Sequence, residues 1–552
     1  MKHLIVILIT LFSIKIYSQK KVLQHDDKGL WNGIKNVSIS NNGDYVAYAI
    51  EKGEKDQSIQ LKSIEGNSIF SQERTKRGNF SYDSKFLAFH ITSWKDSIKE
   101  LKRRKIKKKD LPKDTLAIYD ITSKSLTKIP NIKSFALPKK WSSIILYQLE
   151  AIKKKKDTST KKKVDSLKTK QKLKKVSKDN GYHMVVRYLA SSKEDTLKYV
   201  TNYKIAEEGK FIVYSTTGIK DKLDAGVYMY DVISGESKSI YSTHAKSKFQ
   251  QLGISKTGGK TAFVVDTDTT KALIRQPKLY LWESGQNSAS LIVDSLKRPN
   301  DLLVSGDEVL AFSKNESRLF FGLRPTPIVK DTTLLDEEIV NVEVWTYNEP
   351  RLYTVQELNV NNDKKKSFLS LYDLNTKTMT QISNADYDMS RIAGEGDTEY
   401  AVIGNMTPYM LQSQWTAQRP IDVKLVNLAN GTQRNLATKL YGLNGLSPKG
   451  KYAYGYSRKD STWYTYNLES LKYRALTKNK LFYTEENDYP NDPYSYGIAG
   501  WTDEDKHVLI YDRYDIWSFN PETGTSERLT NGRLNKIVYR YCLLYTSPSP
   551  RD

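Results

Sequence analysis

The amino-acid sequence predicts an all-β protein, a β-propeller of about seven or eight four-stranded blades. Three observations lead to this prediction. Short runs alternate apolar and polar side chains with a period of two, which is typical of antiparallel strands. One turn-and-strand pattern recurs roughly every 40 to 60 residues, the spacing of propeller blades. The 552 residues include 37 Tyr, a residue that suits strands with one face in water.

The first half of the repeat is a polar turn that leads into an apolar strand. Residues Ser40–Asp44 precede Tyr45–Tyr48, and Ser447–Lys451 precede Tyr452–Tyr454. Further copies lead into strands that begin at Phe86, Phe211, Thr261 and His507. A single four-stranded sheet cannot bury both of its faces, so blades stacked around an axis explain the repetition.

The second half of the repeat is a strand that ends in Tyr or Trp, followed by a polar residue, a turn and another strand. Its copies are Leu116–Asp120, Val227–Asp231, Leu279–Glu283, Leu371–Leu374 and Ile516–Asn520. A pair of β-sandwiches would also alternate in this way, but sandwiches do not require such self-similarity. The propeller is therefore the preferred interpretation, with a blade left incomplete at the C-terminal end as an open alternative.

The first 18 residues have the order of a signal peptide. Lys2 supplies a positive charge, Leu4–Phe12 is a short apolar run, and Tyr17-Ser18 forms a cleavage site before Gln19. The run is too short to span a bilayer, so no stable membrane insertion is expected. A buried N-terminal strand is the alternative. We therefore expect an exported protein, periplasmic or extracellular, whose propeller covers residues 19–541.

The last eleven residues, Cys542–Asp552, match the translation of a widely used transposase sequencing adapter. We expect residues 542–552 to be a non-native, adapter-derived tail, which would make Cys542, the single cysteine, an artefact. An exported chain without disulfides must rely on its core. The run Lys536–Tyr539 reads as the start of a further strand, so the native gene is expected to continue beyond Tyr541.

The net charge of +24 is concentrated in two insertions, residues 99–113 and 151–180. Together they carry +17 of this charge. Neither insertion interleaves aromatic residues with its lysines, so neither offers a stacking platform for bases, and nucleic acid is not an expected partner. Solvated, mobile insertions are the preferred interpretation, with contact to an anionic surface or an acidic peptide as the alternative.

The sequence contains no recognisable catalytic motif. A nucleophile elbow needs Gly-x-Ser-x-Gly, and both Gly253–Thr257 and Gly445–Lys449 lack the second glycine. The run Gly259–Thr261 resembles the end of a phosphate loop, but Ile254 occupies the position of its first glycine. The six histidines are scattered and none pairs at metal spacing. No catalytic residue, metal or cofactor is predicted, and a fluorophosphonate probe should not label this chain.

Polar and aromatic residues are densest in Gly500–Asp503 and Tyr511–Trp517. Within the second run, Arg513 lies between Asp512 and Asp515. A guanidinium group that points into an inner channel would bind the carboxylate of a peptide, so these three residues are the candidate substrate-binding site. A structural ion pair between strands is the alternative.

The runs Tyr496–Asp503, Tyr511–Trp517 and Leu529–Arg533 resemble the propeller of exported serine peptidases of the prolyl oligopeptidase family, of the Bacteroidetes type. The lysine-rich insertion before Lys113–Tyr119 also resembles that group. The likeness extends over roughly Leu30–Tyr541 and is most specific in the C-terminal motifs.

This resemblance implies an α/β-hydrolase domain after the propeller, with a Ser-His-Asp triad for which the present sequence offers no residues. It also implies that the propeller restricts entry to short peptides. We therefore expect the substrate-gating portion of a secreted serine peptidase that acts on peptides, with the catalytic domain outside this chain. A non-catalytic periplasmic propeller that binds a protein or peptide is the alternative, and the oligomeric state is open.

Overall fold

The computed structural model describes residues 22–24, 27, 31–150 and 174–541, except positions 54, 76, 271, 295, 296, 300, 330, 336, 341, 343 and 417. The chain divides into two compact units, whose described parts are residues 22–135 and 136–541. Three predicted segments lie outside the described residues: the signal peptide, residues 151–173 of the second basic insertion, and the adapter-derived tail.

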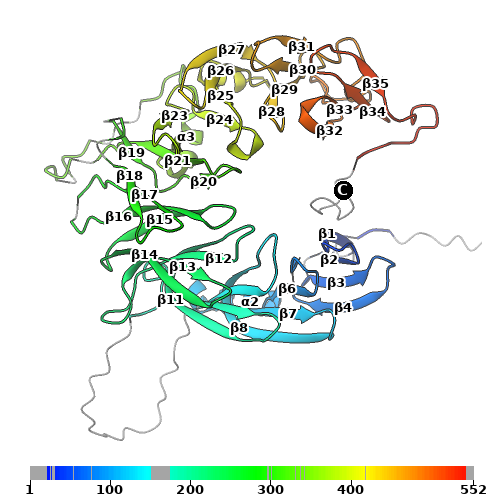
Figure 1. Cartoon of the computed structure of the whole chain (residues 1–552). Helices are drawn as coiled ribbons and strands as arrows, with labels where there is room; N and C mark the ends of the chain where they lie inside the picture. Colours follow the sequence, from blue (N-terminus) through cyan, green and yellow to red (C-terminus); the bar gives the residue numbers. More distant parts are fainter. Residues whose placement is uncertain are drawn as a thin grey trace, which may run out of the picture. The chain divides into compact units, whose positions relative to one another are not determined.

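The first unit contains two runs of four antiparallel strands, and consecutive strands pair within each run (Figure 1). They are β1 (Asn32–Ile39), β2 (Tyr45–Lys52), β3 (Ser58–Ser63) and β4 (Ser68–Glu73), then β5 (Gly78–Phe80), β6 (Phe86–Ile91), β7 (Asp114–Asp120) and β8 (Ser125–Ala136). The basic stretch 99–113 lies between β6 and β7. It contains most of helix α2 (Lys95–Arg103) and the 3-10 turn η2 (Lys108–Asp110), neither of which has a buried residue.

The second unit begins with six strands that pair in chain order. They are β9 (Ile144–Leu149), β10 (Tyr182–Tyr188), β11 (Glu194–Ile205), β12 (Phe211–Thr216), β13 (Ala225–Asp231) and β14 (Glu236–Thr243). The next sheet is β15 (Lys248–Ile254), β16 (Lys260–Asp266), β17 (Lys278–Glu283) and β18 (Ser290–Val293). It is followed by β19 (Leu302–Val304), β20 (Ala311–Phe312), β21 (Arg318–Pro325), β22 (Phe368–Asp373) and β23 (Met379–Gln381), with helix α3 (Tyr353–Asp363) between β21 and β22.

Three more four-stranded sheets complete the second unit. The first is β24 (Met389–Ile392), β25 (Tyr400–Asn405), β26 (Ile421–Asn427) and β27 (Gln433–Leu440), with η3 (Gly394–Gly396), η4 (Thr407–Tyr409) and α4 (Met410–Ser413) in its connections. The second is β28 (Leu443–Leu446), β29 (Tyr452–Ser457), β30 (Thr462–Asn467) and β31 (Tyr473–Ala475). The third is β32 (Ile498–Trp501), β33 (Val508–Tyr511), β34 (Ile516–Phe519) and β35 (Ser526–Arg528), with η5 (Asp503–Asp505) after β32.

The hydrophobic cores lie between successive sheets. One cluster joins Phe320 and Leu371 of β21 and β22 to Ala401 and Ile403 of β25. The cluster that contains Trp463 of β30 likewise includes strands β33 and β34. Four-stranded antiparallel sheets that bury their faces against one another are propeller blades. The predicted all-β propeller fold is confirmed, and the number of blades stays a prediction.

Five of the six predicted turns, together with a further turn at Ser313, share one hydrogen-bond pattern, whereas the predicted turn before Phe211 begins at Ala206 and has no hydroxyl at its first position. In each turn that shares the pattern, the backbone N–H of the fourth residue donates to the carbonyl of the first residue. The backbone N–H of the sixth residue donates to the side-chain hydroxyl of the first residue. The turns begin at Ser40, Ser81, Ser255, Ser313, Ser447 and Thr502. The fourth residue always has a positive φ, which explains glycine at Gly43, Gly258 and Gly450.

Where the fourth residue is not glycine, its side chain bonds to the turn of the preceding sheet. The backbone N–H of Asn42 donates to the Ser84 hydroxyl (3.2 Å), and that of Thr257 donates to the Glu316 carboxylate (2.7 Å). Asp505 accepts from the Lys449 N–H (3.0 Å) in the same way. Left-handed backbone is strained for these residue types. The strain is therefore offset by a hydrogen bond that joins neighbouring blades.

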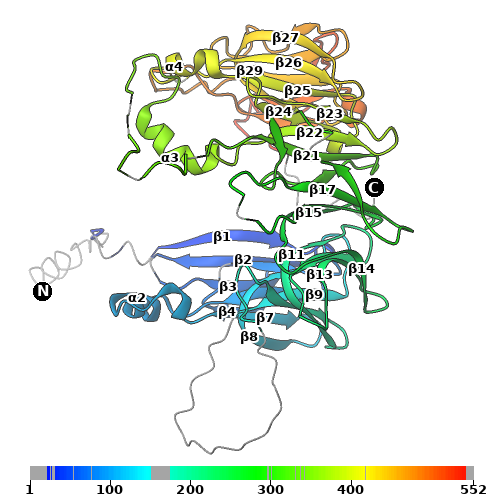
Figure 2. The same ribbon diagram turned by 90° about the vertical axis from the view of Figure 1, so that its left-hand side faces the viewer.

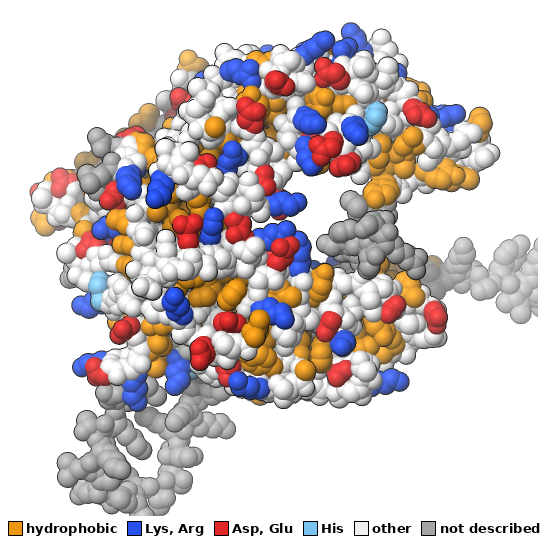
Figure 3. Space-filling view, viewed as in Figure 1, with side chains coloured by type: hydrophobic (Ala, Val, Ile, Leu, Met, Phe, Trp, Pro, Cys, Tyr) orange, Lys and Arg blue, Asp and Glu red, His pale blue; other side chains and the backbone are white. Residues whose placement is uncertain are grey.

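The surface visible in Figure 3 intersperses Lys and Arg with Asp and Glu on each unit. In the part of the chain that the structure describes, no helix is long and apolar enough to cross a membrane. Among the same residues, no group of three or more His, Cys, Asp and Glu could hold a metal ion.

The expected strand over Lys536–Tyr539 is wrong. These residues form a turn and an irregular segment. Lys536 itself has a positive φ of 54°, which a strand does not allow. The segment instead folds back onto the β33–β34 turn. The Tyr539 N–H donates to the Tyr514 carbonyl at 2.7 Å, and the Tyr541 N–H donates to the Tyr511 hydroxyl at 3.0 Å.

Candidate functional site

Asp512 occupies the tight turn between β33 and β34 and is buried. One of its oxygens accepts the backbone N–H groups of Tyr514 (2.7 Å) and Asp515 (2.6 Å). The other accepts the indole N–H of Trp517 at 3.1 Å and lies 3.4 Å from the Arg533 guanidinium. Both carboxylate oxygens are thus held by the fold.

Asp515 ends the same turn and is fully buried. Its carboxylate accepts the Thr530 hydroxyl (2.8 Å), the Gly532 N–H and the Arg533 N–H (3.2 Å). Burial by itself would raise the pKa of Asp515. The hydrogen bonds to the ionised form outweigh burial, and the pKa lies below its usual range. Asp515 thereby ties the β33–β34 turn to the segment that follows β35.

Arg513 differs from the two aspartates because its side chain is partly exposed. Its guanidinium bonds to the Glu486 carboxylate, which raises the pKa of Arg513, and lies 5.2 Å from the Tyr514 ring. Glu485, the neighbour of Glu486, binds Arg533 with both oxygens (2.7 and 3.2 Å). The three predicted residues thus lie on one turn, and Arg513 alone presents a charged group at the surface.

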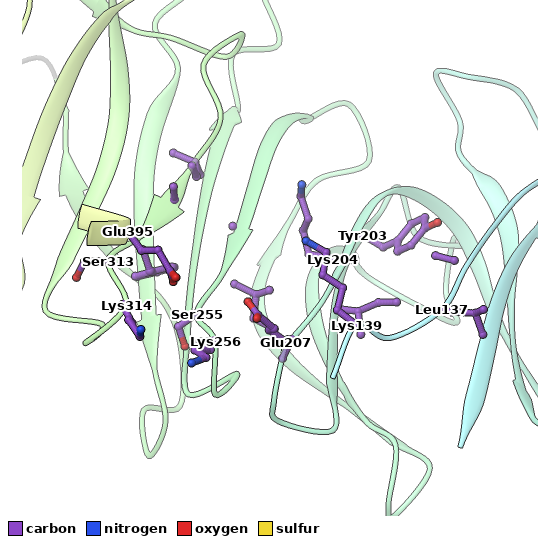
Figure 4. Close-up of a pocket in the computed structure, with 18 residues that line it drawn as sticks. Leu137, Lys139, Tyr203, Lys204, Glu207, Ser255, Lys256, Ser313, Lys314 and Glu395 are labelled. Carbon is purple, nitrogen blue, oxygen red and sulfur yellow. The ribbon is translucent and has the colours of Figure 1, made fainter. Parts of the chain in front are cut away.

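A second candidate site is a cleft of about 470 Å³ at the ends of β11, β15 and β20. Its lining comes from these strands, from the turns beside them, and from Ala136, Leu137, Lys139 and Glu395. Figure 4 shows Lys139 and Lys204 on one side and Ser313, Lys314 and Glu395 on the other. Glu207, Ser255 and Lys256 lie between them.

The charge of the cleft is positive. Four lysines line it, Lys139, Lys204, Lys256 and Lys314, against two carboxylates. One of these carboxylates, Glu207, lies 2.7 Å from the ammonium of Lys140, and this hydrogen bond raises the pKa of Lys140. Lys256 pairs with Glu208 at 2.9 Å, whereas Lys139, Lys204 and Lys314 have no ion pair among the described residues. The cleft therefore offers unpaired ammonium groups to an anionic ligand.

The sequence interpretation did not single out these lysines. Lys256 and Lys314 each follow the first serine of a repeated turn, and Glu207 occupies the equivalent place after Ala206. The second position of the turn therefore faces the cleft in three successive sheets. Aligning the turns by this position is the sequence signal that would have revealed the site.

A serine and a histidine lie close together in the turn between β14 and β15. The Ser247 hydroxyl is 3.4 Å from both ring nitrogens of His244, and Nε2 of His244 is 2.8 Å from the Thr267 carbonyl. The Ser247 hydroxyl is buried and also bonds to Thr243 at 2.9 Å. We assign this pair to the hydrogen bonding of the turn, because Ser247 is buried and its hydroxyl is already bonded to Thr243.

No protein-family model matches this chain, and no curated protein sequence matches it. Among solved structures, the chain is similar to the β-propeller domain of the Trilobed protease from Pyrococcus furiosus. The identity is 12%, the match covers 74% of this chain and 99% of that domain, and the TM-score is 0.29. It is also similar to a eukaryotic initiation factor, with 10% identity, 81% and 89% coverage, and a TM-score of 0.38.

Two further solved structures are peptidases. Pyrococcus horikoshii acylaminoacyl peptidase is 14% identical over 79% of this chain, with a TM-score of 0.29. A prolyl endopeptidase is 10% identical over 89% of this chain, with a TM-score of 0.31. The chain spans 58% and 55% of their respective lengths. Peptidases and propeller domains are thus among the structures that this all-β chain is similar to, at identities too low to assign an activity.

Proposed function

We propose that this chain is the substrate-gating propeller portion of a secreted serine peptidase that acts on peptides. The resemblance of Tyr511–Trp517 and its flanking motifs to the prolyl oligopeptidase family supports the peptidase class. The α/β-hydrolase domain that this resemblance implies would supply the nucleophile, and the propeller would select which peptides reach it.

The lysine-lined cleft supports the proposal that the substrate is a short peptide. Every peptide with a free C-terminus ends in a carboxylate, and the unpaired ammonium groups of Lys204 and Lys314 lie on opposite sides of the cleft (Figure 4). Its volume of about 470 Å³ accommodates a few residues of a peptide rather than a folded protein. The cleft would therefore bind short peptides through their terminal carboxylate.

Peptide-binding measurements test this proposal. A labelled tetrapeptide with a free carboxylate should bind with roughly 10-fold higher affinity than its C-terminal amide, because one charge–charge contact is lost. The double substitution Lys204→Glu and Lys314→Glu should remove this preference. Lys128→Glu is the control, because Lys128 is exposed on β8 and is not one of the residues that line the cleft. Equal binding of the acid and the amide would refute the proposed cleft function.

A further inference from the structure

The connection between β21 and β22, residues 326–367, is a long insertion with an unusual surface. Loops of this length that contain their own helix are commonly functional. Large hydrophobic side chains are exposed along it, including Val340 (81%), Trp345 (68%) and Tyr347 (93%). Trp415, which follows α4, is 85% exposed. Exposed apolar groups gathered in one place indicate an interaction surface.

These side chains surround a pocket of about 490 Å³, which we call the aromatic pocket. Its lining combines the insertion, the first part of α3 and the residues around α4, and Figure 2 shows both helices at the same side of the second unit. The aromatic and apolar lining residues are Val344, Trp345, Tyr347, Leu352, Tyr353, Leu411 and Trp415. The pocket shares no lining residue with the lysine-lined cleft.

Several contacts hold the pocket in shape before any ligand binds. The ring of Trp345 stacks on that of Tyr353 with centroids 4.5 Å apart. Arg351 binds Asp363 with two hydrogen bonds (2.7 and 3.2 Å), which ties the segment before α3 to the helix end. The Gln414 side chain donates to the Pro350 carbonyl at 3.1 Å and so joins the α4 region to the insertion. A preorganised aromatic surface binds with a small loss of conformational entropy.

The charge around the pocket is opposite to that of the whole chain. The insertion, residues 326–367, contains eight acidic and five basic residues and so has a net charge of −3, although the chain carries +24. Arg351, the basic residue that lines the pocket, is neutralised by Asp363. The exposed Glu349 lies in the pocket lining itself. Aromatic faces attract cations, and nearby carboxylates strengthen that attraction.

We propose that the aromatic pocket is a docking site for a cationic peptide segment, one whose lysine or arginine residues flank apolar side chains. The apolar side chains would occupy the pocket, and the cations would lie against the aromatic faces and the acidic residues of the insertion. Trp, Tyr and Arg dominate the binding energy of protein interfaces, so Trp345 and Trp415 are the expected anchors. This site is distinct from the lysine-lined cleft and independent of its proposed function.

Fluorescence anisotropy with two labelled dodecapeptides tests the proposal. The first alternates lysine with leucine and phenylalanine, and the second replaces every lysine with glutamate. The lysine peptide should bind saturably, and Trp415→Ala should weaken it by about 10-fold or more. Glu349→Gln should weaken it less and reduce its dependence on salt. Ile233→Ala is the matched control, because Ile233 is a large hydrophobic residue, 78% exposed, outside the pocket.

Three results would overturn the proposal. The first is equal binding of the lysine and glutamate peptides, which would remove the charge argument. The second is unchanged binding to Trp415→Ala, which would place the peptide elsewhere. The third is a concentration-dependent dimer in sedimentation velocity that Trp415→Ala dissociates, because the occupant would then be a second copy of the chain. The cleft variants Lys204→Glu and Lys314→Glu should leave binding of the lysine peptide intact.

Discussion

The connection between the second and third strands takes opposite forms in two blades of this protein. Between β33 and β34 it is a tight turn in which Asp512 and Asp515 are buried and hydrogen-bonded to the backbone. Between β21 and β22 it is the insertion of residues 326–367, whose aromatic side chains are largely exposed. The same place in the blade thus serves either to close the fold or to present a surface. Buried polar groups indicate structure, and exposed aromatic groups indicate recognition.

The largest expected effect is on the stability contributed by the tight β33–β34 turn. Asp515→Ala should lower the free energy of unfolding by about 3 kcal/mol, because three donors lose a buried, charged acceptor. Urea denaturation followed by tryptophan fluorescence measures this loss. Asp515→Asn should recover part of it, since one oxygen remains as an acceptor. A loss below about 0.5 kcal/mol for the alanine variant would show that the turn does not depend on this carboxylate.

The pH dependence of stability also tests the role of the Asp515 carboxylate. The native pKa of Asp515 is lowered, so its stabilising contribution is fully present above the unfolded value near 4. The contribution is lost as the pH falls through the lower native pKa. The drop in the urea midpoint between pH 7 and pH 3 should therefore be smaller in Asp515→Asn than in the unchanged chain. Identical drops would assign the acid sensitivity to other carboxylates.

Substitutions in the repeated turns should have an effect on stability of intermediate size. Glu316 has a positive φ of 57°, and its carboxylate binds the preceding turn. Glu316→Ala loses the hydrogen bond and keeps the strain, whereas Glu316→Gly loses the bond and relieves the strain. The glycine variant should be more stable than the alanine variant by about 1 kcal/mol. The order of the two urea midpoints tests this, and the reverse order would contradict it.

The smallest expected effect on stability is at the aromatic pocket beside the β21–β22 insertion. Trp415→Ala should change the free energy of unfolding by less than about 0.5 kcal/mol, because the side chain is 85% exposed. Its effect should appear in binding of the lysine peptide instead. A large loss of stability would mean that Trp415 supports the fold, and the contrast between the two connections would fail.

Much of the fold was predictable from local patterns. The turns at Ser40, Ser447 and Thr502 recur because each needs a side-chain hydroxyl and a left-handed residue at fixed spacing, and such requirements are visible in the sequence. The cluster around Tyr511–Trp517 was also visible as a dense polar run. What each carboxylate does was not, because Asp515 bonds to Thr530, Gly532 and Arg533, which lie well beyond the turn.

The sequence by itself determined the all-β class and the repetition of blades, because period-two alternation and turn chemistry act within a few residues. Only the tertiary structure brought Lys204, Lys256 and Lys314 from three successive blades to one cleft, and Trp345 and Trp415 to one pocket. Lys256 and Lys314 share a position in the repeated turn, but the repeat does not show that Lys204 joins them or that the two tryptophans meet, since this proximity comes from the packing of sheets against one another. A repeat predicts where a side chain lies within its own blade, whereas a site between blades depends on the stacking.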